Sequence, residues 1–175
     1  VQTCALPILA EINAADLPRF MQLLASVFEH SPWVAERAAG ARPFASADAL
    51  HESMRAVVLQ AGVDEQLALI RAHPELAGRE AVQGAMTADS TSEQGRLGLT
   101  ALPRAEFERV TQLNRAYREK FGFPCIVALK LHDSRDTVLA EMARRLANDQ
   151  ETEMTNALAQ IGHITRARIA KLLET

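Results

Sequence analysis

Residues 103–124 read PRAEFERVTQLNRAYREKFGFP, and they carry the clearest helical pattern in the chain. In this stretch apolar side chains recur every three or four residues, at Phe107, Val110, Leu113 and Tyr117. Such spacing places them on one face of an α-helix that packs against other elements. Gly122 and Pro124 are residue types that end helices. We therefore predict a helix that begins near Pro103 and is broken by the turn at residues 122–124.

The same periodicity covers most of the chain. We expect further helices over residues 17–28, 33–39, 47–61, 64–73, 134–148 and 152–173, and a helical segment that starts at Ser90. Asn13 is the expected N-cap of the first of these and Ser46 that of the third. Residues 125–131 are short and apolar, so their pattern does not distinguish strand from helix. Strand alternation, hairpin signals and repeats are absent from the sequence, which predicts an all-α fold: a compact single-domain bundle of about eight helices.

The composition excludes several classes of protein. The chain has 175 residues, the length of one domain, with a formal net charge of −3 and a sequence pI of about 6.0. A nucleic-acid partner is not expected, because such proteins carry a strongly basic face. Two cysteines are too few for a disulfide-rich scaffold or a four-cysteine metal site. Because no apolar run approaches the ~20 residues that span a bilayer, we expect a cytoplasmic protein with no membrane partner.

The first residues differ from the rest of the chain. Val1 to Ile8 contain neither a methionine nor the basic region of a signal peptide. We expect residues 1–7 to be an extension or an expression remnant, and residues 8–175 to form the all-α domain.

The helical pattern fails between Pro74 and Ser90, where we expect a loop of about a dozen residues. Loops of that length in compact domains are often functional. His73 comes directly before this loop, and Pro74 disfavours helical geometry at that position, so a turn orients the imidazole. The side chain either caps the end of its helix or serves as a proton carrier in a site.

The sequence Ser90-Thr91-Ser92-Glu93-Gln94 has two interpretations. Ser90 with Glu93, or Thr91 with Gln94, matches the capping box at the start of a helix and needs no function. Alternatively, hydroxyls, a carboxylate and an amide converge at a helix N-terminus, whose N–H groups favour a polar or anionic ligand.

Two further segments are candidates for ligand binding. Gly122 and Pro124 could expose the backbone amides that follow, those of Ile126 and Val127, to a ligand. The alternative is a helix stop followed by buried chain. Arg168, on the last amphipathic helix, is either a solvated cation or a bidentate partner for a carboxylate or ureido group.

Other kinds of site are not indicated. Cys125 follows a proline in an apolar run, which is more typical of a packed small hydrophobe than of a nucleophile. No His, Cys, Asp or Glu residues have the spacing of metal ligands, so no metal is expected.

Taken in order, the segments resemble those of one family. The matching segments are FEHSPWVA (28–35), RPF (42–44), HPELAG (73–78), STSEQ (90–94), LN (113–114) with Tyr117, KFGFP (120–124), RLAN (145–148) and RI (168–169). This order resembles the OHCU decarboxylases, whose substrate is 2-oxo-4-hydroxy-4-carboxy-5-ureidoimidazoline. The resemblance implies an all-α fold, a homodimer and no metal or organic cofactor. It also implies that the chain catalyses the last step of urate breakdown to (S)-allantoin, with the small-molecule ureidoimidazoline substrate as its partner.

The resemblance further implies which residues form the site. His73 matches the catalytic histidine of the family, and Glu93 matches the second catalytic candidate. The matching substrate-binding positions are Pro74, Ser90, Thr91, Ser92, Glu93, Gln94, Cys125, Ile126, Val127, Ala128, Leu129 and, less closely, Arg168.

Three positions depart from the family pattern. Cys125 stands where an aromatic residue is usual, which changes the shape of the pocket but not its backbone hydrogen bonds. Glu75 replaces the commoner Asp, and Ala167 replaces the commoner Leu, but neither change touches the proposed chemistry.

Two alternatives to this enzyme are considered. One is an enzyme of the same fold that acts on another ureido acid, which assays on several ureido acids would distinguish. The other is a non-catalytic helical module in which His73 and Ser90–Glu93 only cap helices. That alternative predicts that the imidazole and the Glu93 carboxylate are far apart.

Overall fold

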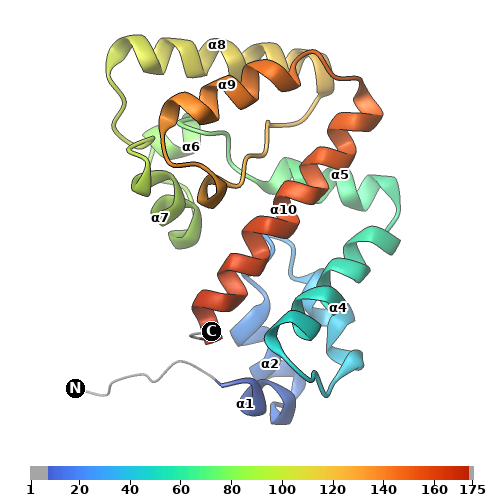
Figure 1. Ribbon diagram of the computed structural model, residues 1–175. Helices are drawn as coiled ribbons and strands as arrows, with labels where there is room; N and C mark the ends of the chain where they lie inside the picture. The colour runs from blue at the N-terminus through green and yellow to red at the C-terminus, as the bar shows by residue number, and fades with distance from the viewer. Residues whose placement is uncertain (1–7, 174–175) are drawn as a thin grey trace, which may run out of the picture. The chain divides into compact units, whose positions relative to one another are not determined.

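The computed structural model describes residues 8–173, and within that range it contains ten α-helices, two 3-10 helices and no strand (Figure 1). The all-α class predicted from the sequence is confirmed. The predicted extension, residues 1–7, lies outside the described residues. The helices group into two compact units, of which the first comprises residues 8–69 and 165–173 and the second residues 70–164.

The first unit is a group of short helices around an apolar core. It contains α1 (Leu9–Ala14), α2 (Leu17–Leu24), α3 (Trp33–Ala38), η1 (Ala39–Ala41), α4 (Ala47–Gln60) and parts of α5 (Val63–Ala72) and α10 (Gln150–Leu173). Helix α3 packs against both α2 and α4. The core side chains of this unit include Phe20, Leu24, Val34, Leu50 and Met54.

The first long helix predicted from the sequence begins and ends elsewhere. Asp16, not Asn13, is the N-cap of α2, because its carboxylate accepts a backbone N–H of the first turn at 2.9 Å. Asn13 belongs to α1, and its side-chain amide makes two hydrogen bonds with the backbone of Phe44, at 2.8 and 2.9 Å. Helix α2 ends at Leu24, not at Phe28, and turns follow it.

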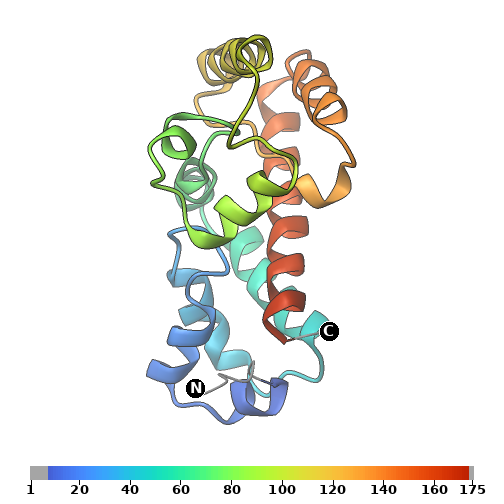
Figure 2. The same ribbon diagram turned by 90° about the vertical axis from the view of Figure 1, so that its left-hand side faces the viewer.

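The second unit contains the long helix predicted from residues 103–124. Its elements are the end of α5, α6 (Arg79–Val82), α7 (Ala88–Arg96), α8 (Arg104–Phe121), η2 (Leu129–Leu131), α9 (Arg135–Arg145) and residues 150–164 of α10. Helix α8 packs against α9, and α7 packs against η2 (Figures 1 and 2). Gly122 ends α8 with a φ of +76°, in the left-handed region that favours glycine. The apolar stripe of α8 is buried as predicted, except for Phe107, which is 39% exposed.

Two segments that the sequence left undefined have distinct structures. The loop expected between Pro74 and Ser90 contains the short helix α6 and the first residues of α7. Residues 125–131, for which strand and helix were both open, form no strand: they are non-helical as far as Ala128 and then form the single 3-10 turn η2.

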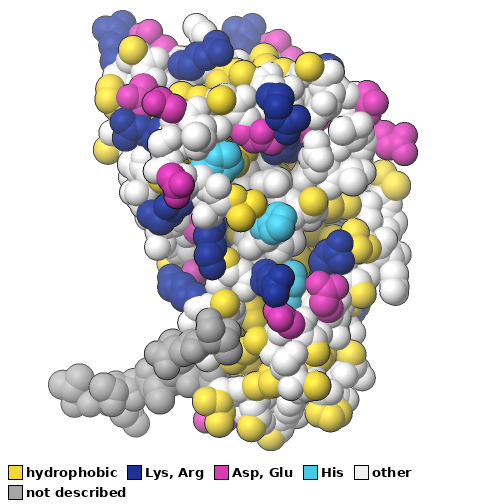
Figure 3. Space-filling model, viewed as in Figure 1, with side chains coloured by type: hydrophobic (Ala, Val, Ile, Leu, Met, Phe, Trp, Pro, Cys, Tyr) yellow, Lys and Arg dark blue, Asp and Glu magenta, His cyan; other side chains and the backbone are white. Residues whose placement is uncertain are grey.

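The surface shows no basic stripe on the face drawn in Figure 3, where Lys and Arg side chains are interspersed with Asp and Glu. This distribution agrees with the small negative formal charge of the chain, −3. Among residues 8–173, no helix is both long enough and apolar enough to cross a bilayer.

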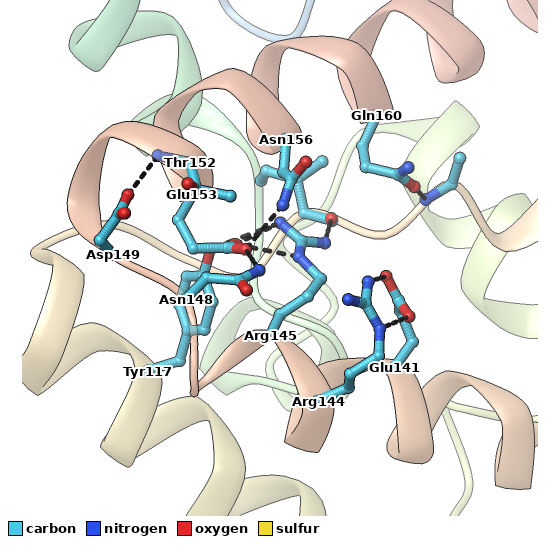
Figure 4. Close-up of polar contacts among 12 residues, drawn as sticks. Tyr117, Glu141, Arg144, Arg145, Asn148, Asp149, Thr152, Glu153, Asn156 and Gln160 are labelled. Carbon is cyan, nitrogen blue, oxygen red and sulfur yellow. Dashed lines mark hydrogen bonds and ion pairs between the residues drawn. The ribbon is translucent and has the colours of Figure 1, made fainter.

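A buried polar cluster links three helices of the second unit (Figure 4). The side chains of Arg145 and Glu153 are 1% and 0% exposed and form an ion pair at 2.8 Å. The hydroxyl of Tyr117 donates to the same carboxylate, and Asn148 and Asn156 donate to its other oxygen at 2.7 and 2.8 Å. Burial alone would raise the pKa of Glu153, but these donors, led by Arg145, hold the pKa below its ordinary value.

We predict that Glu153→Gln lowers the free energy of unfolding at neutral pH by about 3–5 kcal/mol, because it removes the counter-charge of a buried guanidinium. The pKa of Glu153 is lower in the folded than in the unfolded chain. Its stabilising contribution is therefore complete above the unfolded pKa of about 4.3 and is lost as the pH falls through the folded pKa. The difference between the two proteins in urea unfolding should shrink as the pH is lowered through this range.

Glu141→Gln is the matched control for this prediction. Glu141 pairs with Arg144 at 2.7 Å, but that arginine side chain is 62% exposed, so the same substitution should cost much less (Figure 4). A cost of Glu153→Gln that does not change with pH would contradict the prediction.

Candidate active site

His73 directly follows α5 and is buried, with 6% of its surface exposed. Its backbone N–H donates to the carbonyl of Ile70 at 3.2 Å, which closes the last turn of the helix. Pro74 then disfavours a further helical residue. The turn that the sequence predicts at His73 is present, and it leaves the imidazole inside the protein.

Side chains from α7 and α8 hold the loop that follows the histidine. Gln94 accepts the N–H of Ala77 at 2.8 Å through Oε1 and donates to the carbonyl of Glu75 at 3.2 Å through Nε2. Asn114 donates to the carbonyl of Leu76 at 2.8 Å. Backbone groups that are buried outside a helix need such partners. Both helices therefore support this conformation of the loop.

The sequence of the loop also restricts its conformation. Ala77 has a φ of +47°, in the left-handed region that most residues avoid. At Gly78 an added Cβ would lie 2.6 Å from the Cβ of Glu75, so a side chain there would force a shift. Glu75 is itself held, because its carboxylate accepts from Nε of Arg118 at 2.7 Å.

The start of α7 contradicts the capping-box interpretation. The N-cap of α7 is Thr87, whose hydroxyl accepts the N–H of Ser90 at 3.3 Å. Ser90 and Glu93, like Thr91 and Gln94, lie inside the helix and do not form its cap. The sequence pattern was ambiguous because Thr87 is also a good N-cap residue, three positions before the serine.

Only three of the five predicted residues on α7 share its buried face. Ser90, Glu93 and Gln94 are three and four positions apart, so they lie on one side of the helix. Ser90 and Gln94 are buried, and Glu93 is half-buried. Thr91 and Ser92 are exposed, and the Thr91 hydroxyl donates to a backbone carbonyl one turn earlier at 2.9 Å.

Helix α7 also contacts the segment after the Gly122–Pro124 turn. Arg96 donates to the carbonyls of Leu129 and His132, the latter at 2.9 Å. Through Gln94, the same helix also contacts the loop after His73. In the second unit the structure therefore joins all three predicted segments through α7, namely residues 73–78, 90–94 and 125–129.

The backbone amides of Ile126 and Val127 remain predicted ligand-binding groups. Both residues are buried, each 3% exposed. Within the part of the chain that the structure describes, neither N–H donates to a protein acceptor. A buried N–H without an acceptor costs free energy, so two of them in succession favour the binding of a carbonyl or carboxylate oxygen.

Cys125 is a neutral, packed side chain. Burial raises the pKa of this thiol to about 12, well above the value of an exposed cysteine. This supports its interpretation as a small hydrophobe.

Arg168 belongs to the first unit and is not a solvated cation. It is 6% exposed, and its Nη1 donates to Oε2 of Glu29 at 2.9 Å and to the carbonyl of Val27 at 3.2 Å. Glu29 is 1% exposed, and sequence reasoning missed it as the partner of Arg168. The one signal in the sequence is that this acidic residue directly follows Phe28 in an apolar pattern. A carboxylate that is buried there needs a counter-charge.

Known proteins with similar sequences and folds agree in their description. Residues 13–170 match the model of a family described as OHCU decarboxylase. The chain is 39% identical over 163 residues to the 2-oxo-4-hydroxy-4-carboxy-5-ureidoimidazoline decarboxylase of Haloferax volcanii, covering 93% of this chain and 94% of that relative. A crystal structure of (S)-allantoin synthase is similar with a TM-score of 0.74 and 27% identity, over 97% of this chain and 55% of that one. A crystal structure of OHCU decarboxylase in the presence of (S)-allantoin shares the fold, with a TM-score of 0.70 and 21% identity over 86% of this chain and 97% of that one.

We predict that Cys125 in a folded Cys4→Ser variant does not react with the thiol reagent DTNB at pH 8. A pKa of about 12 leaves about one thiolate in ten thousand at that pH, and the residue is 2% exposed. Absorbance after mixing measures the reaction, and unfolding in urea should restore one reactive thiol. Rapid labelling of the folded protein would show that the thiol is accessible and activated.

Proposed function

Because the chain belongs to the OHCU decarboxylase family, we propose that it is a carboxy-lyase that converts 2-oxo-4-hydroxy-4-carboxy-5-ureidoimidazoline to (S)-allantoin in urate degradation. One observation supports the site within the second unit. Helix α7 holds the loop after the buried His73 through Gln94, and its same face carries Ser90 and Glu93. An imidazole, a carboxylate and backbone N–H donors are the groups that proton delivery and anion binding require.

The substrate supplies its own electron sink. Its carboxylate is attached to a ring carbon next to a C=N bond. When the bond to CO₂ breaks, its electron pair moves into that imine and leaves an electron-rich, enol-like ring. One proton is delivered to a single face of the neighbouring carbon, and the hydroxyl proton passes to the ring nitrogen as that oxygen becomes a carbonyl, which together give (S)-allantoin. The enzyme must therefore hold the carboxylate out of conjugation with the ring, stabilise the intermediate and place a proton donor.

We assign proton delivery to His73 and orientation of the ring and its hydroxyl to Glu93. Histidine suits the first role because its ordinary pKa lies near neutrality. The reverse assignment is the competing one, since an imidazole and a carboxylate titrate as a unit where they lie close together. The variants described below measure what each side chain contributes to the rate.

The remaining polar groups bind the substrate in this proposal. The N–H groups of Ile126 and Val127 donate to a carboxylate or carbonyl oxygen, since no protein acceptor within residues 8–173 takes them. Ser90 and Gln94 bind the ureido group. Gln94 already uses its oxygen and one N–H on the loop, so one amide hydrogen is left for this contact.

Two contacts are proposed from the family pattern alone. Pro74 lines the site beside the histidine, and Arg168 binds the ureido or carboxylate group.

The proposal extends to the state of the enzyme in the cell. The resemblance to the family supports a homodimer, and the low cysteine content supports the cytoplasm, a reducing compartment. Neither a metal nor an organic cofactor has a part in the chemistry proposed here, because the substrate carries the electron sink.

We predict that dialysis against EDTA leaves turnover unchanged. Among residues 8–173, no three His, Cys, Asp or Glu side chains are grouped as a metal site would require. Formation of (S)-allantoin is followed by circular dichroism, with the substrate generated in situ from urate. Activity that is lost on chelation and restored by one divalent metal would contradict the prediction.

We predict that His73→Gln folds normally but loses about 10²–10⁴-fold in turnover, the typical contribution of a general acid. Far-ultraviolet circular dichroism checks the fold, and the chiral allantoin assay measures the rate. His163→Gln is the matched control, because His163 is exposed on α10. Near-wild-type turnover in folded His73→Gln would remove His73 from the mechanism.

We predict that Glu93→Gln loses orders of magnitude in turnover with little loss of stability. The N-cap of α7 is Thr87, so the substitution removes a charge and no cap. Thermal unfolding and the allantoin assay are measured on the same samples, with the exposed Glu151→Gln as control. Unchanged turnover in Glu93→Gln would show that the carboxylate charge has no role in catalysis.

A further inference from the structure

Two helices of the second unit bind the backbone on either side of Val127, through the side chains of Arg145 and Gln160. From α9, Nη1 of Arg145 donates to the carbonyl of Ile126 at 2.5 Å. From α10, Oε1 of Gln160 accepts the N–H of Ala128 at 2.8 Å. The segment is buried and non-helical, so these side chains supply the backbone hydrogen bonds that a helix would otherwise make.

The two hydrogen bonds fix the conformation at Val127. No cis peptide bond of the described residues lies in this segment, so its peptides are planar and trans. In a trans peptide the carbonyl and the N–H point in opposite directions. Since the carbonyl of Ile126 points to Arg145, the N–H of Val127 points away from it. Gln160 fixes the next peptide plane, and the rotations between the two planes are the φ and ψ of Val127.

Arg145 is a rigid support because it is itself held. Its guanidinium contacts the carboxylate of Glu153 through Nη2 at 2.8 Å and through Nε at 2.9 Å, with both side chains buried. Gln160 lies seven residues after Glu153, two turns later on the same face of α10. One helix face therefore supplies both the counter-charge of Arg145 and the second contact to the segment.

Stability alone does not require a charged pair at this place. Arg145 continues the buried stripe of α9 that Val138 and Met142 begin. Replacing a buried ion pair by apolar residues of similar volume is often neutral or stabilising. An apolar residue at position 145 could fill the core, but it could not bind the carbonyl of Ile126.

We propose that Arg145 and Gln160 are positioning residues of the decarboxylation, which orient the N–H of Val127 toward the substrate without contacting the substrate. The inference rests on the proposed function, in which this N–H binds a substrate oxygen. Arg145 acts through the peptide between Ile126 and Val127, and Gln160 acts through the N–H of Ala128.

Gln160 is the residue on which to test the proposal, because it is half-buried and uncharged, so its loss leaves no buried charge without its partner. Gln160→Glu keeps an acceptor for the N–H of Ala128, whereas Gln160→Met keeps the length and loses the acceptor. Gln112→Met, at an exposed position of α8, is the matched control for the substitution itself. The assay gives kcat and KM for (S)-allantoin formation from substrate generated in situ from urate, and thermal unfolding is measured beside it.

We expect Gln160→Met to lower kcat/KM by about tenfold to a hundredfold, the range that a small misplacement of a binding group causes. Gln160→Glu and Gln112→Met should stay within about threefold of the wild type. A merely structural role predicts that activity follows the folded fraction alone. Equal kcat/KM for folded Gln160→Met and Gln160→Glu would therefore overturn the proposal.

Amide hydrogen exchange separates this inference from the proposed function. In Gln160→Met, the N–H of Ala128 should exchange faster, while the N–H of Ala77, which Gln94 holds, should not change. Unchanged exchange at Ala128 overturns the positioning role whatever the activity of the wild type. A wild-type protein that forms no (S)-allantoin overturns the proposed function, and the exchange result still decides whether Gln160 holds the segment.

Discussion

Backbone groups that leave a helix inside a protein must find partners, and an all-α chain has no sheet to supply them. Two segments of the second unit face this requirement, the loop after His73 and the segment from Cys125 to Leu129, and in the latter the N–H groups of Ile126 and Val127 have no acceptor among the described residues. In both, side chains of neighbouring helices replace the helical hydrogen-bond ladder. The side chains that do so are Gln94 and Asn114 for the loop, and Arg96, Arg145 and Gln160 for the segment.

The same requirement explains why one short helix carries so much of the candidate site. Gln94 and Arg96 are two residues apart on α7, and each binds one of the two non-helical segments. The face of α7 that carries Gln94 also presents Ser90 and Glu93. In Gln94, support of the backbone overlaps with the predicted binding of the substrate. The resemblance assigned it to the substrate, yet its amide oxygen and one N–H hold the backbone beside His73.

Hydrophobic periodicity predicted the helices well because their buried faces repeat, but it reports burial and not backbone conformation. Val27 and Phe28 are buried beyond the end of α2, so the pattern placed the end of that helix too late. The segments of the candidate site could be predicted because their motifs occur in a specific order. Their partners could not: Glu29 and Arg168 are 139 positions apart, and a single sequence carries no signal of which buried charges pair.

The proposed reaction depends on the precise placement of binding groups more than on reactive side chains. Its substrate holds the electron sink, and the thiol of Cys125, in the candidate binding segment, is kept neutral by burial. Backbone N–H groups suit such a task because they have no rotamers, and their direction is set only by the planes of the peptides. Those planes are fixed by Arg145 and Gln160, and Arg145 is fixed in turn by Glu153. A buried ion pair can often be replaced by apolar residues at little cost to stability, yet it can still be necessary where the precise direction of one N–H depends on it.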